Sequence, residues 1–176
     1  PTRDRARVYG HVKAETLDEM VENCKKLKAL GFTAIGHFNP FLDEDRDQPY
    51  FKPYAQKIDD AVRVVATVRE AVGQDFDLCI EIHRRLTPAE AVAFARELEP
   101  YRPMFYEDPI RPDSFDAMAR VNDRISIPLA TGERYTSIFD FQNLLTREGV
   151  SYVRPSICLC GGITGARKIA ALAEAH

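Results

Sequence analysis

Three short apolar runs each lead into a glutamate: Leu78-Cys79-Ile80-Glu81, Met104-Phe105-Tyr106-Glu107 and Leu129-Ala130-Thr131-Gly132-Glu133. The glutamates lie 26 residues apart, about the length of one strand, one helix and two loops. Repeating βα units build parallel sheets, and in a closed barrel all strands open their carboxyl ends on the same face. The spacing therefore predicts an α/β fold of the (β/α) TIM-barrel type, with the three glutamates at one mouth.

Carboxylates on neighbouring strands lie roughly 5 Å apart and would repel one another by on the order of 3 kcal/mol at an effective dielectric near 20. A divalent cation removes that cost, and ligands that are all oxygen favour Mg²⁺ over Zn²⁺. We therefore predict that Glu81, Glu107 and Glu133 bind Mg²⁺. The alternative is three unrelated surface glutamates, since 27 of the 176 residues are acidic, but the flanking strands repeat along with the spacing.

The rest of the chain fits six βα units. Strands are predicted at 7–12, 33–38 and 151–154 as well as before the three glutamates. Capping residues and prolines predict helices that begin near Thr16, Thr87, Asp113, Ser137 and Thr164. In the last helix, five apolar residues are predicted to face the core: Ile163, Ala166, Ile169, Ala170 and Ala173.

Six units do not close a barrel that needs eight strands. We therefore expect these residues to be an internal piece of a longer polypeptide. A doubly wound sheet is the alternative, but no glycine-rich phosphate turn follows the first predicted strand. The loop from Asn39 to about Tyr54 is long and of mixed composition, which favours an active-site lid.

Composition narrows the class of partner. The net charge is −3, and there is no basic stripe, so we expect no binding to nucleic acid. The apolar runs are too short to cross a membrane. Cys24 and Cys79 occupy apolar positions, which is typical of buried, reduced thiols in a cytoplasmic protein. Cys158 and Cys160 form only a weak metal-binding pattern.

Polar residues near the predicted strand ends add candidate site residues. His83 follows Glu81 by two residues, and Asn39 follows His37 by two, so each pair would share one face of a strand. Arg134 directly follows Glu133, and Arg154 ends the sixth predicted strand. An arginine beside a divalent cation suits an anionic, carboxylate-bearing substrate. Arg134 pairing with a glutamate, and a purely structural His37, are the alternatives.

The glycine-rich segment Gly161-Gly162-Ile163-Thr164-Gly165 lies between a predicted strand and a predicted helix, where a phosphate could bind. It lacks the full dinucleotide-binding pattern. Close packing of the backbone at the barrel mouth is the favoured interpretation.

Five motifs together resemble the enolase superfamily, of the mandelate racemase/muconate lactonizing enzyme type. They are the three glutamates at strand ends, Glu81-Ile82-His83-Arg84-Arg85, Glu107-Asp108-Pro109, Thr131-Gly132-Glu133-Arg134 and Cys160-Gly161-Gly162-Ile163-Thr164. Within that superfamily the chain is most similar to acid-sugar dehydratases of the mannonate and galactonate type. The likeness extends over essentially the whole chain.

The resemblance implies a lyase, specifically a hydro-lyase, that acts on a small-molecule sugar acid with Mg²⁺ held by the three glutamates. The α-proton is removed to give a metal-stabilised enediolate, and the 3-hydroxyl is then eliminated. In this family the histidine at the position of His83 is the acid that expels the hydroxyl, and an arginine similar to Arg154 meets the substrate carboxylate. His37, Asn39 and Arg134 are expected to complete the substrate site.

The general base is left open by the sequence. His37, a loop tyrosine (Tyr50 or Tyr54) assisted by Arg46, or a histidine beyond residue 176 are the candidates. The resemblance also implies that residues 1–176 belong to the C-terminal barrel domain, and that the family's N-terminal capping domain and last barrel strands lie outside them. We further expect a homo-oligomer.

Two other functions compete with dehydration. A racemase, epimerase or cycloisomerase of the same superfamily would share the metal site, but His83 favours dehydration over these. A barrel that has lost catalysis and only binds a ligand is the third possibility. The complete set of metal ligands argues against it.

Overall fold

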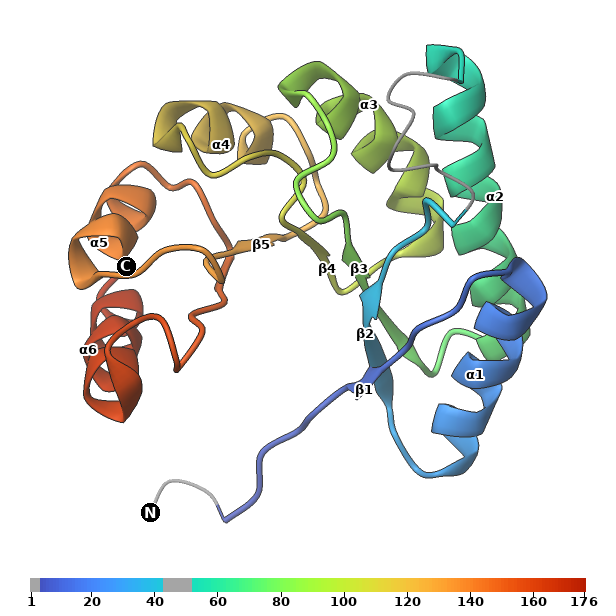
Figure 1. Cartoon of the computed structure of the whole chain (residues 1–176), viewed down its shortest axis with the longest axis horizontal. Coiled ribbons are helices and arrows are strands. Elements are labelled where there is room, and N and C mark those ends of the chain that lie inside the picture. The colour runs from blue at the N-terminus through green and yellow to red at the C-terminus, as the bar shows by residue number, and fades with distance from the viewer. Residues whose placement is uncertain (1–3, 43–51) are drawn as a thin grey trace. The chain divides into compact units, whose positions relative to one another are not determined.

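The computed structural model describes residues 4–42 and 52–176. Strands and helices alternate along the chain (Figure 1). The chain divides into two compact units, one formed by residues 1–81 with 100–104 and the other by residues 82–99 with 105–176.

The first unit contains three strands and two long helices. In chain order they are β1 (Gly10–His11), α1 (Leu17–Ala29), β2 (Ala34–Phe38), α2 (Tyr54–Val72) and β3 (Asp77–Glu81). α1 and α2 lie side by side on the outside of the strands (Figure 1). The apolar face of α2 is buried, with Ile58, Val65 and Val68 in the core.

The second unit repeats the same alternation. Its elements are α3 (Pro88–Leu98), β4 (Phe105–Glu107), α4 (Phe115–Asn122), β5 (Leu129–Thr131), α5 (Ile138–Thr146), β6 (Tyr152–Val153) and α6 (Gly162–Glu174). A single 3-10 turn, η1 (Glu99–Tyr101), follows α3. The core of this unit is formed mainly by Phe94, Leu98, Tyr106, Met118, Leu129, Phe141 and Leu144.

The strands within each unit are parallel and follow the order of the chain. β1 pairs with β2 and β2 with β3 in the first unit, and β4 pairs with β5 and β5 with β6 in the second. This order within each unit agrees with a strand arrangement of the barrel type.

The starts of α1, α3 and α5 follow the capping residues predicted from the sequence. At α3 the Thr87 hydroxyl accepts from the backbone N–H of Glu90, and the Glu90 carboxylate accepts from the backbone N–H of Thr87. Thr16 accepts from the backbone N–H of Glu19 at α1, but the Glu19 carboxylate accepts from Glu15 instead of Thr16. The full capping box is thus confirmed at α3, and only half of it forms at α1.

Two predicted elements differ from the structure. The first strand was expected over 7–12, yet only Gly10 and His11 pair with β2. In α6 only Ile169 is buried, whereas Ile163 is 73% exposed. Burial depends on what packs against a helix face, and periodicity shows only that an apolar face exists. The expectation that Ile163 and Ala170 face inward was therefore wrong, because both are exposed.

The buried side chain of Arg69 binds backbone carbonyls of two loops in the first unit. Arg69 of α2 donates through Nη1 to the carbonyls of Gly73 and Phe76 at 2.8 and 2.6 Å. Its Nε donates to the Tyr101 carbonyl at 2.9 Å, and its Nη2 to the Arg102 carbonyl at 3.3 Å. Buried carbonyls need donors. The Arg69 side chain makes hydrogen bonds to four carbonyls and so connects two separate loops to α2.

No helix among the described residues is both long enough and apolar enough to span a membrane. All four cysteines are free thiols, and Cys24 and Cys79 are buried as predicted. Burial raises the pKa of Cys24 to about 12, so its thiol stays protonated at neutral pH.

Candidate active site

The three glutamates of the repeating pattern lie at or just after strand ends. Glu81 is the last residue of β3 and Glu107 the last residue of β4. Both are buried, with only 2% of each residue exposed. Glu133 comes two residues after β5, and 36% of its side chain is exposed. Two of the three carboxylates are therefore largely removed from water, which is costly for a charged group without a partner.

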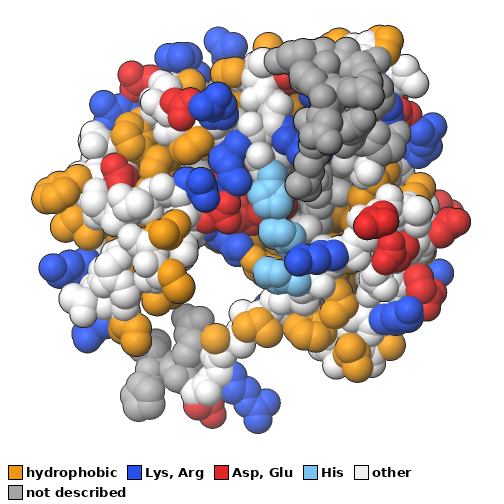
Figure 2. Space-filling view, in the orientation of Figure 1, with side chains coloured by type: hydrophobic (Ala, Val, Ile, Leu, Met, Phe, Trp, Pro, Cys, Tyr) orange, Lys and Arg blue, Asp and Glu red, His pale blue; other side chains and the backbone are white. Residues whose placement is uncertain are grey.

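His37 is the partner of Glu81 within the first unit. Its Nδ1 lies 3.9 Å from Oε2 of Glu81. The ring of His37 stacks on that of His11, with centroids 5.2 Å apart and planes 1° apart, and His11 in turn stacks on Tyr9. Histidine side chains are visible on the face shown in Figure 2. The stack restrains the orientation of the His37 ring beside Glu81.

The simple alternation expected for the two histidines does not hold. His37 has φ of 60° and lies at an irregularity in the pairing of β2 with β3. β3 ends at Glu81, and His83 has φ of 55°. Left-handed backbone interrupts the period of two that holds in a regular strand. The regular alternation from which the shared faces were predicted is therefore interrupted at both histidines.

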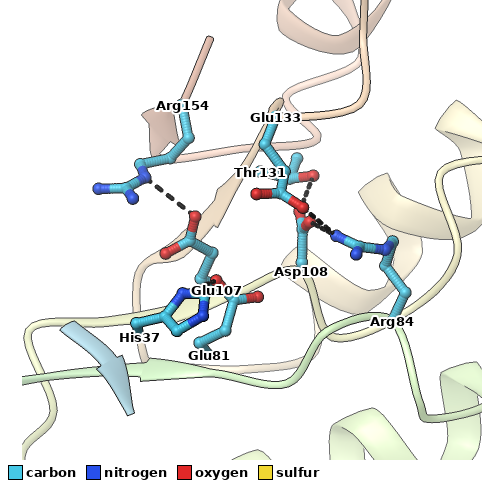
Figure 3. Close-up of polar contacts among 8 residues, drawn as sticks. All are labelled: His37, Glu81, Arg84, Glu107, Asp108, Thr131, Glu133 and Arg154. Atoms are coloured by element: carbon cyan, nitrogen blue, oxygen red, sulfur yellow. Dashed lines mark hydrogen bonds and ion pairs between the residues drawn. The ribbon is translucent and has the colours of Figure 1, made fainter. Parts of the chain in front are cut away.

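Glu107 has an arginine partner in the second unit. Nε of Arg154 donates to Oε1 of Glu107 at 3.0 Å (Figure 3). The Arg154 guanidinium lies 5.4 Å from the centre of the Phe105 ring, which restrains it further. Burial raises the pKa of Glu107 from the ordinary 4.5 to about 7, and the nearby Arg154 charge opposes that rise. Glu107 therefore gains or loses a proton near neutral pH.

A second charged cluster in the same unit joins Arg84, Asp108, Thr131 and Glu133. Nη1 of Arg84 contacts Oδ2 of Asp108 and Oε1 of Glu133, each at 2.5 Å. The Thr131 hydroxyl donates to Oδ1 of Asp108 at 2.6 Å. Burial raises the pKa of Asp108, although the Thr131 hydrogen bond and Arg84 both oppose the rise. Figure 3 shows Arg84 reaching to both carboxylates.

The remaining predicted site residues are distributed differently. Oδ1 of Asn39 accepts from the backbone N–H of Phe41 at 3.0 Å, which closes a local turn. Arg134 is exposed, and the cation that pairs with Glu133 is Arg84. Tyr54 begins α2 and is 53% exposed. Arg46 and Tyr50, with most of the predicted lid, lie outside the described residues.

The donor set fits a hard divalent cation. Glu81, Glu107 and Glu133 offer carboxylate oxygens only, and this is the ligand chemistry that Mg²⁺ prefers. Glu107 also shows the electrostatic strain that such a cation relieves, because its pKa is raised by burial despite a neighbouring arginine. Nearby Asp108 and Glu133 add to that rise. A divalent cation would replace these repulsions with attraction.

Sequence reasoning missed the cluster around Arg84. The sequence motifs include Asp108 and Thr131 but assign neither a role, although both are buried polar residues. A usable signal was present, because an aspartate that directly follows a strand-end glutamate needs its own partner. Nothing local in the sequence identifies that partner, since Arg84 lies 24 residues before Asp108 and 49 before Glu133.

The chain matches a known family model and several known proteins. Residues 19–176 match the model described as "Enolase C-terminal domain-like". The D-galactonate dehydratase of Xanthomonas euvesicatoria pv. vesicatoria is 36% identical over 174 residues, which cover 99% of this chain and 44% of that protein. The D-galactonate dehydratase of Pectobacterium atrosepticum is 34% identical, and the match again covers 99% of this chain and 44% of that protein.

A solved structure agrees in fold. The crystal structure of a mandelate racemase/muconate lactonizing enzyme-like protein from Rubrobacter xylanophilus has a TM-score of 0.90 and 30% identity, and the match covers 98% of this chain and 49% of that one. This chain thus spans less than half the length of these relatives. The predicted α/β fold, a (β/α) barrel of which the chain holds only part, is confirmed.

Proposed function

The chain belongs to the enolase C-terminal domain-like family, and on that premise we propose that it is part of the catalytic barrel of an Mg²⁺-dependent acid-sugar dehydratase. The observation that carries the proposal is the buried carboxylate of Glu107 at a strand end, with Arg154 at 3.0 Å and a pKa raised to about 7. The similarity to D-galactonate dehydratases over 99% of the chain supports a galactonate-like substrate. A mannonate-like acid is the other substrate that we propose to test.

Glu81, Glu107 and Glu133 are the residues that we propose to hold Mg²⁺. When bound, Mg²⁺ supplies positive charge that neutralises a substrate carboxylate while the weakly acidic α-proton is removed. Arg154 is restrained by Glu107 and Phe105, so its guanidinium is preorganised to hold the same carboxylate. Preorganised charge of this kind costs little reorganisation during the reaction.

The elimination needs one base and one acid. The base takes the α-proton from C2, the electron pair forms a double bond between C2 and C3, and the C3–O bond breaks. We propose that protonated His83 donates the proton with which the 3-hydroxyl leaves as water. Among the described residues we propose His37 as the base, because its ring is oriented by His11 and lies 3.9 Å from Glu81. The resulting enol becomes a 2-keto-3-deoxy acid.

The test uses the full-length protein, Mg²⁺ and a panel of sugar acids in heavy water, followed by NMR. We expect a 2-keto-3-deoxy product from at least one acid. His83→Asn should lose elimination but keep exchange of the α-proton, because the base and the metal ligands are intact. His176→Asn makes the same substitution at an exposed position and should behave as the wild type.

The outcomes separate the competing functions. Exchange without elimination in the wild type would favour a racemase or epimerase that shares the metal site. Loss of both exchange and elimination in His83→Asn would make His83 the base or a structural residue. No reaction with any acid, in protein that binds Mg²⁺, would favour a barrel that only binds a ligand. We also propose that the protein is a cytoplasmic homo-oligomer, which light scattering and fractionation can test.

A further inference from the structure

One nitrogen atom bridges two carboxylates beside the proposed metal site. Nη1 of Arg84 lies 2.5 Å from Oδ2 of Asp108 and 2.5 Å from Oε1 of Glu133. Burial works against the charge of Arg84, but the hydrogen bonds and charges of Glu133 and Asp108 outweigh it and raise the pKa of the guanidinium. Arg84 is therefore a permanent cation held between two acids.

Asp108 is the fixed end of this bridge. Its side chain is 3% exposed, and its second oxygen accepts from the Thr131 hydroxyl at 2.6 Å. Its backbone N–H donates to the Ala130 carbonyl at 2.9 Å. Both residues that anchor it belong to β5. Asp108 thus has little freedom to move relative to β5, the strand that precedes Glu133.

The backbone supports the same arrangement. Arg84 has φ of 64° and Asp108 φ of 45°, left-handed values that are strained for residues other than glycine. The backbone N–H of Arg84 donates to the Asp108 carbonyl at 2.7 Å. Two successive strand exits therefore adopt strained turns that bring Arg84 over Asp108. Strain of this kind persists only where surrounding contacts require it.

Glu133 is the more exposed end of the bridge. It lies two residues beyond β5, follows Gly132 with φ of 140°, and has a side chain that is 36% exposed. A glutamate in that setting would sample several rotamers. The contact with Arg84 uses Oε1 and so restricts the direction in which Oε2 points.

We propose that Arg84 is a positioning residue for metal binding, which ties Glu133 to the anchored Asp108 and so presents the Glu133 carboxylate to the cation. This inference rests on the proposed function, because Glu133 is there a ligand of Mg²⁺. Groups that orient metal ligands typically change metal affinity by 10–100-fold when removed. Arg84 itself need not touch the cation or the substrate.

The test measures Mg²⁺ affinity directly, by isothermal titration with MgCl₂ alone at pH 8 and fixed ionic strength. Arg84→Met removes the charge and the donors but keeps an unbranched apolar stem, and it should weaken Mg²⁺ binding by about 10–100-fold. Arg84→Lys should recover part of the loss, because a single ammonium nitrogen can also bridge two carboxylates. Thr131→Val, which removes only the hydrogen bond from the Thr131 hydroxyl to Asp108, should cause a smaller loss of Mg²⁺ affinity.

Arg111→Met is the matched control. Arg111 pairs with Asp113 at 3.0 Å on the surface of the same unit, and its side chain is 78% exposed. This variant makes the same change in charge and should bind Mg²⁺ as the wild type does. Melting curves of the metal-free proteins accompany each titration, because a purely structural role predicts a lower melting temperature with an unchanged dissociation constant in the folded protein.

Each outcome decides the proposal. Affinity that is unchanged in folded Arg84→Met overturns it, and tighter binding would mean instead that Arg84 competes with the cation for Glu133. Should Arg84→Met fail to fold, wild-type affinity in both Arg84→Lys and Thr131→Val overturns it. A wild-type protein that binds no Mg²⁺ overturns the magnesium site of the proposed function, and with it the role of Arg84.

Discussion

Protonation of Glu107 should control Mg²⁺ binding around neutral pH. Its pKa lies at about 7 in the folded protein, raised from 4.5 mainly by burial. A metal ligand must be deprotonated, so the cation competes with the proton. With one competing proton, the apparent dissociation constant is multiplied by one plus ten to the power (pKa − pH). The constant should therefore be about tenfold larger at pH 6 than at pH 8.

The assay is a calorimetric titration of the metal-free protein with MgCl₂ at pH 6, 7 and 8. Buffers with different ionisation enthalpies would count the protons released, and about one should leave per Mg²⁺ at pH 6 and about a tenth of one at pH 8. Arg154→Met removes a charge that lowers the Glu107 pKa, so the transition should move to higher pH. Equal dissociation constants at pH 6 and pH 8, with no proton release, would refute the reasoning.

The same pKa shift has a consequence for stability without metal. Because the folded-state pKa of Glu107 lies above its unfolded value, folding favours the protonated form. The stability that this gives is fully present below pH 4.5 and is lost as pH rises through about 7. Added Mg²⁺ should therefore raise the melting temperature more at pH 8 than at pH 6, where the proton competes.

Three further predictions follow from single contacts. Glu107→Gln should abolish Mg²⁺-dependent turnover, because an amide is a weaker ligand, and normal turnover would show that Glu107 is no ligand. Arg69→Met should lower the free energy of unfolding in urea by about 3–5 kcal/mol, because four carbonyls lose a charged donor; a loss below about 1 kcal/mol would contradict the role assigned to Arg69. Thr87→Ala should cost about 1 kcal/mol through loss of the α3 cap, whereas Thr136→Ala, at an exposed position before the α5 cap, should be nearly neutral.

Local features of the fold were predictable because neighbouring residues determine them. The capping box of Thr87 and Glu90 involves residues three apart. The position of Glu81 and Glu107 at strand ends follows from the apolar runs directly before them. The number of βα units and the parallel order of strands follow from the repeated spacing of about 26 residues.

The partners of the charged side chains could not be predicted in this way. Arg154 and Glu107 are 47 residues apart, and Arg84 and Glu133 are 49 apart. Which arginine meets which carboxylate depends on strand register and on the left-handed turns at Arg84 and Asp108. A shift of the strand register by one residue would turn these side chains to the other face of the sheet.

The sequence by itself determined the βα repeat, the carboxylates at three of the strand ends and the chemistry that such oxygens can support, because these depend on residue type and short-range spacing. Only the tertiary structure decided that Glu107 is buried against Arg154, that Glu133 is held through Arg84 to Asp108, and that Ile163 of α6 is exposed. Burial and long-range ion pairing arise from contacts between distant segments, and those contacts exist only once the backbone is folded.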